Sequence, residues 1–362
     1  MIKVVFADDS ALMRREIKRL LDKQKNIELV GVAKDGQEGL NLVLEHEPDV
    51  VLLDINMPNM DGITALQRIM MESPRPVIML SSLTQDGSDT TYECLEVGAV
   101  DFIAKPGGTV SKNLYEVEAE IISKIESASI AITESIRNRR VRRLKRGQDS
   151  VREQQQRIKS RKEKKGKVPP ENKIVVIGQS TGGPNTSMDI IPYLPKDLTA
   201  PVVVIQHMPA NFTPSFAERL NNNCAFPFKE IKMHDLLELG HGYLAPGSIH
   251  SVLKLTKNKD ALEFKVTQYP KDTLHSPSVD VTMDSILEIY GENVIGVLLT
   301  GMGADGADAM AKIKKAGGKT ICESEETAIV FGMPKEAIKR GGADFILPSY
   351  EIADKITELV FA

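Results

Sequence analysis

A serine in a glycine-rich turn is the residue best placed for chemistry. The segment 173–184 is KIVVIGQSTGGP, in which a run of branched apolar residues predicts a buried strand and the glycines predict a sharp turn around Ser180. Residues 178–182 fit the G-x-S-x-G pattern, which presents the serine hydroxyl at a strand-to-helix corner beside an oxyanion-binding N–H group. Because a glycine-rich loop before a helix is also typical of phosphate or dinucleotide sites, this segment alone leaves both interpretations open.

A histidine and an aspartate follow two further predicted strands. His207 comes directly after residues 201–206, PVVVIQ, and Asp305 lies in the turn TGMGADG after the apolar run 294–299. Since the carboxyl ends of parallel strands share one edge of a sheet, Ser180, His207 and Asp305 can converge there. A serine hydroxyl needs a base, and a histidine base needs a carboxylate that fixes its tautomer. These residue types predict acyl transfer through a serine nucleophile.

The first third of the chain places a second set of polar residues at predicted strand ends. Three carboxylates, a hydroxyl and an ammonium group are placed in this way: Asp8, Asp9, Asp54, Ser81 and Lys105. Carboxylate oxygens suit Mg²⁺, and a nearby lysine can neutralise a transferred phosphoryl group. We therefore predict that Asp54 is phosphorylated.

In this order, the residues resemble the receiver domain of two-component response regulators. The resemblance rests on the acidic pair, the central aspartate, the strand-end serine and the Lys-Pro pair at 105–106, and it extends along the whole first segment. It implies a chemotaxis histidine kinase as phosphodonor and Mg²⁺ as the cofactor of phosphorylation. The residue roles that it implies are Asp54 as phospho-acceptor, Asp8, Asp9, Asp54 and the Asn56 carbonyl as Mg²⁺ ligands, Ser81 and Lys105 as phosphoryl contacts, and Phe102 as the rotamer-switch aromatic.

The last half of the chain resembles the catalytic domain of the CheB family of chemotaxis protein-glutamate methylesterases. The shared motifs are GQSTGGP, QHMP, PSVD at 277–280, TGMGADGA and FGMPKEAI, and together they cover essentially all of 173–362. The receiver followed by this domain matches the family from end to end, although the long basic segment between them is unusual.

The second resemblance implies an enzyme that demethylates glutamate methyl esters on methyl-accepting chemoreceptors and releases methanol. It also implies deamidation of glutamines there, and no cofactor for ester hydrolysis. Ser180 is expected to be the nucleophile, His207 the general base and then acid, and Asp305 its orienting carboxylate. The backbone N–H groups of Thr181 and Met302 are the expected oxyanion donors. Of the other histidines, only His275, beside PSVD, merits a test.

The alternation of strands and helices predicts an α/β fold with two doubly wound parallel-sheet domains. We predict a flavodoxin-like receiver domain over 1–125, a basic linker over 126–172, and a Rossmann-like methylesterase domain over 173–362 with an antiparallel hairpin insertion at about 228–268. In the receiver, strands are expected at 4–7, 50–53, 76–80 and 101–104, with helices near 11–21, 36–46, 62–72 and 88–97.

The charge of the predicted linker differs from that of its surroundings. Residues 137–167 hold fifteen Lys and Arg residues against three Asp and Glu residues, whereas the whole chain has a formal charge of −4. We interpret this segment as a solvated tether, with attraction to an acidic partner as the alternative.

Composition limits the class of protein further. The three cysteines are far apart and form no C-x-x-C pair, the N-terminus is unlike a signal peptide, and no apolar run approaches the ~18 residues of a membrane span. We expect a cytoplasmic protein without membrane insertion.

Two other functions are compatible with parts of the sequence. A DNA-binding response regulator could use the basic segment, but no helix-turn-helix pattern follows the receiver, so we expect no nucleic acid partner; salt-sensitive duplex binding would indicate otherwise. A nicotinamide reductase could use the glycine loop, but Ser180 replaces the middle glycine of G-x-G-x-x-G. NADH titration would detect such binding.

Overall fold

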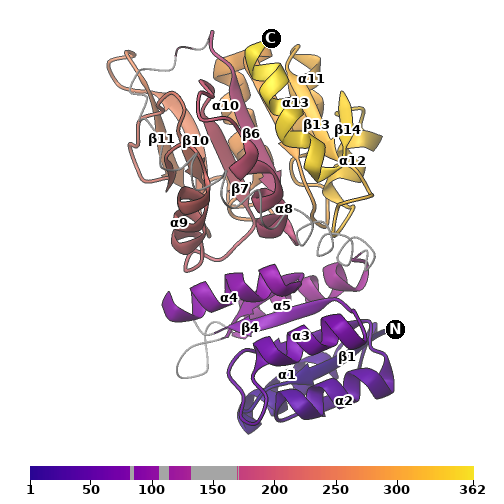
Figure 1. Cartoon of the computed structure of the whole chain (residues 1–362). Coiled ribbons are helices and arrows are strands. Elements are labelled where there is room, and N and C mark those ends of the chain that lie inside the picture. Colours follow the sequence, from indigo (N-terminus) through magenta and orange to yellow (C-terminus); the bar gives the residue numbers. More distant parts are fainter. Residues whose placement is uncertain (82–84, 106–113, 132–168, 170) are drawn as a thin grey trace. The chain divides into compact units, whose positions relative to one another are not determined.

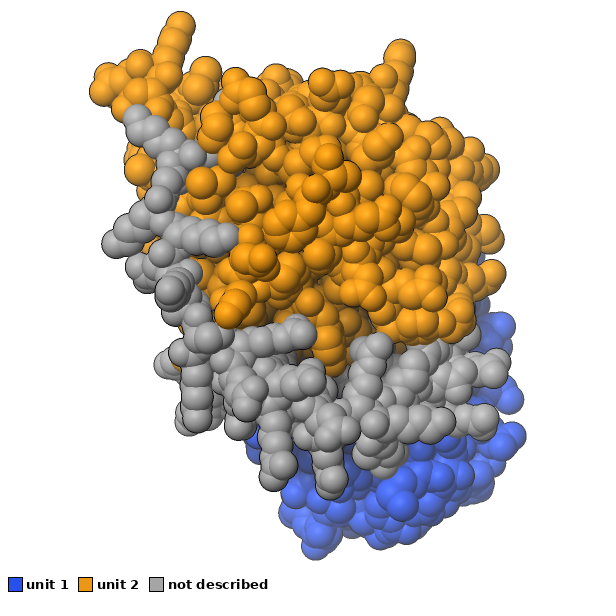
Figure 2. Space-filling model, turned by 45° about the horizontal axis from the view of Figure 1, so that its top comes forward, with its two compact units in different colours: residues 1–143 blue, residues 144–362 orange. Residues whose placement is uncertain are grey.

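A computed structural model describes residues 1–81, 85–105, 114–131, 169 and 171–362. The chain divides into two compact units, Met1–Arg143 and Leu144–Ala362 (Figure 2). Most of the predicted linker lies outside the described residues, so its extent and its role as a tether stay predictions.

The first unit, coloured indigo to magenta in Figure 1, is built on a parallel sheet. This sheet has five strands in the order β2-β1-β3-β4-β5. Strands β3 and β4 are buried at every position. This strand order confirms the flavodoxin-like, doubly wound prediction. The strands are β1 (Ile2–Ala7), β2 (Ile27–Ala33), β3 (Val50–Asp54), β4 (Val77–Ser81) and β5 (Asp101–Ala104), and the helices are α1 (Ala11–Leu21), α2 (Gly36–His46), α3 (Gly62–Glu72), α4 (Gln85–Val97) and α5 (Leu114–Ser129).

Strand β2 is missing from the prediction. It is an edge strand that pairs only with β1, and of its seven residues only Ile27 and Ala33 are fully buried. An edge strand with this much exposure needs no continuous apolar run, which was the signal used for the other strands.

The second unit holds a seven-stranded sheet with the order β14-β13-β12-β6-β7-β9-β8, in which every pairing is parallel. Its strands are β6 (Ile174–Gln179), β7 (Val202–Gln206), β8 (Phe228–Glu230), β9 (Gly242–Leu244), β12 (Val294–Leu298), β13 (Lys319–Glu323) and β14 (Phe345–Leu347). The α-helices are α8 (Gly183–Ile190), α9 (Thr213–Asn223), α10 (Val279–Tyr290), α11 (Ala307–Lys315), α12 (Met333–Lys339) and α13 (Ser349–Phe361), with short 3₁₀ turns at Ile191–Tyr193 and Gly291–Asn293.

The predicted hairpin insertion is right for only part of its length. Strands β10 (His250–Leu255) and β11 (Leu262–Thr267) form a separate antiparallel pair. Strands β8 and β9 instead join the main sheet in parallel, with Phe228 opposite Gly242. A Cβ atom at Gly242 would lie 2.0 Å from the Phe228 ring, so the glycine permits this close pairing. Alternation of apolar and polar residues reports which face of a strand is buried and carries no information on strand direction.

Three neighbouring strands at the centre of this sheet, β12, β6 and β7, position the predicted catalytic residues. Strand β6 leads into the turn that holds Ser180, β7 into the segment that begins with His207, and β12 into the glycine-rich turn before α11. Among the described residues, no helix has the length and apolar character needed to cross a membrane.

Candidate active site

The backbone holds Ser180 at the corner between β6 and α8. Its N–H donates to Thr300 O at 2.9 Å, and its carbonyl accepts from the Gly183 N–H at 2.8 Å. Gly182 has a φ of 79°, and a Cβ there would lie 2.7 Å from Ile329 Cβ. Both the backbone angle and the lack of space therefore require glycine two residues after the serine.

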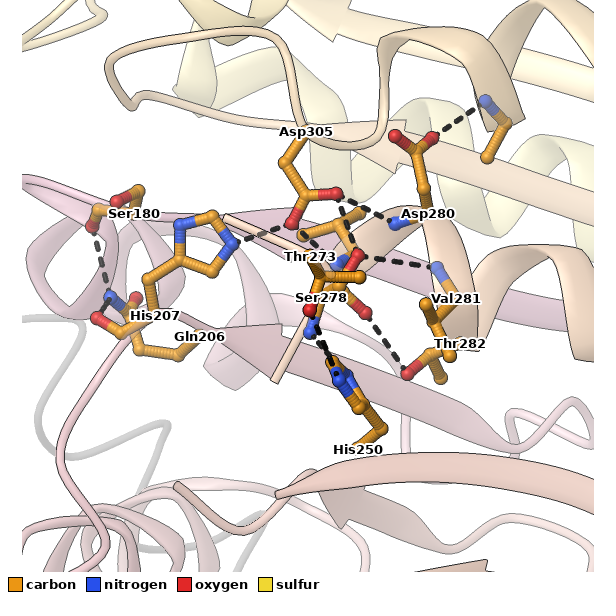
Figure 3. Close-up of polar contacts among 12 residues, drawn as sticks. Ser180, Gln206, His207, His250, Thr273, Ser278, Asp280, Val281, Thr282 and Asp305 are labelled. Atoms are coloured by element: carbon orange, nitrogen blue, oxygen red, sulfur yellow. Dashed lines mark hydrogen bonds and ion pairs between the residues drawn. The ribbon is translucent and has the colours of Figure 1, made fainter. Parts of the chain in front are cut away.

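Gln206 connects the serine loop to the histidine. Its Nε2 donates to Ser180 O at 3.0 Å and to His207 O at 2.9 Å (Figure 3). The Gln206 side chain is buried, and a Cβ on Gly183 would lie 2.2 Å from its Oε1. No role for Gln206 was predicted from the sequence, although a polar residue at the end of a buried strand indicates a residue of the site. The amide fixes the distance between the two loops.

His207 and Asp305 form a direct hydrogen bond. His207 Nε2 lies 2.8 Å from Asp305 Oδ2 (Figure 3). Asp305 also accepts from Ser278 Oγ at 2.9 Å and from the N–H groups of Val279 and Asp280 at 2.7 and 3.0 Å. Burial alone would raise the pKa of Asp305, but the hydrogen bond and charge of His207 and the two backbone donors hold that pKa well below its usual value. Asp305 is therefore ionised and fixes His207 as the tautomer that carries its proton on Nε2.

The other ring nitrogen of His207 is left as a proton acceptor. His207 Nδ1 is buried and has no hydrogen-bond partner within the described part of the chain. Ser180 lies on the side of the ring away from Asp305 (Figure 3). No hydrogen bond joins the Ser180 hydroxyl to His207 among the described contacts; such bonds are often long in enzymes without substrate. The structure thus pairs His207 with Asp305 and places Ser180 on the other side of the ring.

The turn that precedes α11 approaches the serine closely at Gly301. A Cβ atom at Gly301 would lie 2.7 Å from Ser180 Cβ and 2.3 Å from Met333 Sδ. Met302, one of the two predicted oxyanion donors, directly follows Gly301 and therefore lies close to the serine. The N–H group of Thr181, the other predicted donor, has no acceptor among the residues described here.

A buried hydroxyl and carboxylate connect these two loops. Thr300 Oγ1 donates to Thr181 O at 2.9 Å, and the Thr300 N–H donates to Glu323 Oε2 at 2.9 Å. Both Thr300 and Glu323 are fully buried. Glu323 Oε1 accepts in turn from Thr327 Oγ1 at 2.9 Å. The loops with the predicted oxyanion donors are therefore tied to each other through the core.

The PSVD segment supplies residues around the carboxylate whose roles sequence reasoning missed. Ser278 caps α10 and at the same time binds Asp305. Burial, with a contribution from the charge of Asp305, raises the pKa of Asp280 to about 6. The hydrogen bond that Asp280 accepts from the Ala309 N–H at 2.8 Å opposes this shift. The start of α10 thus serves as the support of Asp305.

In the first unit, the three predicted carboxylates lie together. Ligand oxygens of Asp8, Asp9 and Asp54 all lie within 4.8 Å of one another. Lys105 Nζ lies 2.9 Å from Asp8 Oδ2 and 2.7 Å from Asp54 Oδ1. Asp54 Oδ2 is buried without a hydrogen-bond partner among the described residues. An unpartnered buried oxygen among three carboxylates fits a hard divalent cation such as Mg²⁺.

Charge and burial compete at this cluster. Burial raises the pKa of Asp54, with a further contribution from the charge of Asp8, although the hydrogen bond and charge of Lys105 and the Asn56 amide oppose the rise. Burial alone would lower the pKa of Lys105, but Asp54 and Asp8 raise it. The lysine is therefore charged and lies against two carboxylates.

The predicted phosphoryl contact and switch residues lie on the neighbouring strands. Ser81 is fully buried and its Oγ accepts from Thr91 Oγ1 at 2.7 Å. Phe102 is also buried, edge-on to Tyr92 with ring centroids 6.4 Å apart, and Lys124 Nζ lies 5.0 Å from the Phe102 centroid. The aromatic ring thus occupies an inward position in this structure.

Comparisons with known proteins agree with both halves of this description. The family model of the CheB methylesterase matches residues 175–356, and that of the response regulator receiver domain matches residues 4–112. The chain is similar to the protein-glutamate methylesterase/protein-glutamine glutaminase of Caldanaerobacter subterraneus, with 47% identity over 362 residues that cover 99% of this chain and 96% of the relative. The corresponding protein of Thermotoga maritima is 42% identical over 360 residues, which cover 99% of this chain and 98% of that one.

A solved structure supports the second half. The CheB methylesterase catalytic domain of Thermotoga maritima superimposes with a TM-score of 0.50 and 45% sequence identity, and the match covers 52% of this chain and 98% of that domain. Both resemblances predicted from the motifs are confirmed. The chain belongs to the CheB methylesterase family, with a response regulator receiver domain ahead of its catalytic domain.

Proposed function

We propose that this chain hydrolyses the methyl esters of glutamate side chains on chemoreceptors, through Ser180 as nucleophile and the His207–Asp305 pair as its base. The observation that carries the proposal is the 2.8 Å bond that His207 Nε2 donates to Asp305, while Nδ1, which has no partner among the described residues, is on the serine side of the ring. The full-length relatives named protein-glutamate methylesterase/protein-glutamine glutaminase support the substrate class.

The acylation step follows from this geometry. Ser180 Oγ attacks the ester carbonyl carbon while His207 Nδ1 takes the hydroxyl proton, and Asp305 stabilises the imidazolium that forms. The oxyanion is bound by the backbone N–H groups of Thr181 and Met302. The bond from the carbonyl carbon to the methoxy oxygen then breaks, and His207 gives its proton to that oxygen. Methanol leaves, and Ser180 remains as the acyl-enzyme.

Deacylation uses the same residues in reverse. Water replaces methanol, His207 Nδ1 accepts one of its protons, and the water oxygen attacks the acyl carbon. The ester bond to Ser180 breaks, the serine regains its proton, and a glutamate carboxylate is released. With a glutamine side chain, the first leaving group is ammonia, so the same acyl-enzyme accounts for glutaminase activity.

We further propose that phosphorylation of Asp54 by a chemotaxis histidine kinase controls this reaction. Asp8, Asp9, Asp54 and the Asn56 carbonyl would hold Mg²⁺, which when bound neutralises phosphate charge during transfer. Lys105 binds the phosphoryl oxygens by its ammonium group, and the Ser81 hydroxyl contacts the same group. The receiver family match and the clustered carboxylates support these roles.

Replacement of the nucleophile tests the proposal. Ser180→Ala removes the attacking oxygen, and the glycine turn around it remains. We expect methanol release from methylated receptor to fall by at least about 10⁴-fold, with only catalysis by the oxyanion site left. Circular dichroism should show an unchanged fold. Ser215→Ala, at a half-buried serine of α9, is the control, and it should leave hydrolysis near the wild-type rate. Retention of more than a few per cent of activity in Ser180→Ala would contradict the assignment.

A further inference from the structure

One histidine outside the proposed triad lies against the face of the catalytic imidazole. The rings of His275 and His207 stack with their centroids 4.1 Å apart and their planes at 21°. His275 belongs to the segment between β11 and α10, so it reaches the site from a part of the chain that contributes neither the serine nor the base. Offset stacking at this separation is a favourable aromatic contact.

The end of this segment is anchored to the same carboxylate that orients the base. Ser278 donates through Oγ to Asp305 at 2.9 Å, and its N–H donates to His250 Nδ1 at 3.1 Å. Closer to the ring, the Ser248 N–H donates to Ser276 O at 3.1 Å. The backbone on the C-terminal side of His275 is therefore fixed relative to Asp305, through the Ser278 contact that Figure 3 shows.

The stacking contact distinguishes His275 from the other histidines of this unit. His234, His241 and His250 each have a ring nitrogen within hydrogen-bond distance of a protein acceptor or donor. Among the described residues, neither ring nitrogen of His275 makes such a bond. Hydrogen bonding of the ring therefore gives no account of His275, and its stacking on His207 does.

The protonation state of His275 suits this contact. Burial and, to a lesser extent, the neighbouring His207 lower the pKa of His275 to about 4, while Asp305 opposes the shift. The ring is consequently neutral near pH 7. A neutral π face tolerates a positive charge beside it, whereas a second imidazolium would repel the one that forms on His207 during catalysis.

We propose that His275 is a positioning residue for the hydrolysis: its neutral ring covers one face of His207, keeps the imidazole in the plane that joins Asp305 to Ser180, and stabilises the imidazolium. This inference rests on the proposed function, because it assumes that His207 is the base. His275 touches neither the reacting atoms nor the substrate in this account. Its effect is exerted on the rate of the chemical step through the orientation of His207.

Two substitutions test whether a neutral aromatic ring at position 275 supports the reaction. In the full chain, supplied with Mg²⁺ and a small phosphodonor, His275→Ala removes the ring and His275→Phe keeps a neutral aromatic face. We expect kcat for methanol release to fall at least about tenfold in His275→Ala with little change in KM, and His275→Phe to recover most of the loss. His234→Ala, at a histidine whose side chain is 61% exposed, is the matched control and should match the wild type.

Labelling of Ser180 by a fluorophosphonate provides a second readout that needs no receptor. The labelling rate should follow the same order: wild type and His234→Ala fastest, His275→Phe next, His275→Ala slowest. The ring-proton resonances of His207 should also move in His275→Ala, because the shielding by the stacked ring is lost. A merely structural role would lower the unfolding midpoint of both His275 variants and would not distinguish Phe from Ala.

The outcomes separate the two proposals. If Ser180→Ala is labelled as fast as the wild type, the proposed function is wrong and this inference falls with it. If labelling requires Ser180 but His275→Ala is labelled at the wild-type rate, only the role of His275 is overturned. A His275→Phe variant no faster than His275→Ala would overturn stacking as the cause.

Discussion

Both units place an aspartate at the carboxyl edge of a parallel sheet, yet the two sites treat its charge in opposite ways. Asp305 receives four hydrogen bonds from His207, Ser278 and two backbone N–H groups, and its pKa is held low. Asp54 has Lys105 and the Asn56 amide as its favourable contacts, lies beside Asp8, and has a raised pKa. Burial disfavours the charged form at both positions, so the number of donors decides the direction.

The difference matches what each proposed reaction needs. In the proposed mechanism, Asp305 keeps its negative charge and its hydrogen-bond partners throughout each turnover. The four donors stabilise that charge. Asp54 must instead bind a cation and then gain a phosphoryl group. An oxygen without a hydrogen-bond partner among the described residues leaves room for both. On these proposals, the site around Asp305 is organised before substrate arrives, whereas the site around Asp54 depends on an ion and a phosphodonor.

The largest expected effect comes from removal of the permanent charge. Asp305→Asn retains the shape of the side chain but favours the wrong tautomer of His207, so we expect kcat for methanol release to fall about 10⁴-fold. Asp308→Asn is the control, because its side chain is 64% exposed and pairs with Arg340 at the surface. A loss of less than about tenfold in Asp305→Asn would show that Asp305 does not orient the base.

A smaller effect is expected at the receiver edge, where substitution should remove regulation. Asp54→Asn lacks the acceptor oxygen, so a small phosphodonor with Mg²⁺ should neither phosphorylate the chain nor change its rate of methanol release. Asp61 caps α3, and asparagine can cap a helix as well as aspartate, so Asp61→Asn should keep the wild-type response. Phosphorylation measured on intact protein, followed by the hydrolysis assay, checks both statements. A donor response in Asp54→Asn would place the phosphorylation site elsewhere.

The smallest effect concerns stability, and the two aspartates should differ in sign. The raised pKa of Asp54 means that its stabilising contribution is present at low pH and is lost as the pH rises through the folded-state pKa. The lowered pKa of Asp305 means that its contribution is present above the unfolded pKa of about 3.9 and is lost as the pH falls toward the folded value. At pH 7 without Mg²⁺, we therefore expect Asp54→Asn to stabilise its unit and Asp305→Asn to destabilise the other.

Amide hydrogen exchange measures this contrast within one chain. Protection of β3 and β4 should increase in Asp54→Asn, and protection of α10 and β12 should decrease in Asp305→Asn. Each variant serves as the control for the sheet that it does not touch. A change of the same sign in both units would show that the number of hydrogen-bond donors does not decide how these carboxylates contribute to stability.

The sequence predicted where the chemistry would be because apolar runs end at polar residues. Ser180, His207 and Asp54 each end or closely follow a run of buried apolar residues, and this local signal was sufficient to place them at sheet edges. The same signal failed for β2, which is mostly half-buried, and for β8 and β9, whose parallel direction depends on the pairing of Phe228 with Gly242. Pairing direction is a property of two segments, and local alternation describes only one.

The hydrogen bonds and ring contacts around Ser180 and His207 could be seen only in the tertiary structure. The sequence by itself determined the family, the parallel α/β architecture and the residue types at both edges. Only packing determined that Nε2 of His207 faces Asp305, that Gln206 ties Ser180 to His207, and that His275 stacks on the base. The physical reason is that orientation and hydrogen-bond partners depend on side chains brought together from separate strands and loops, and no spacing along the chain encodes that geometry.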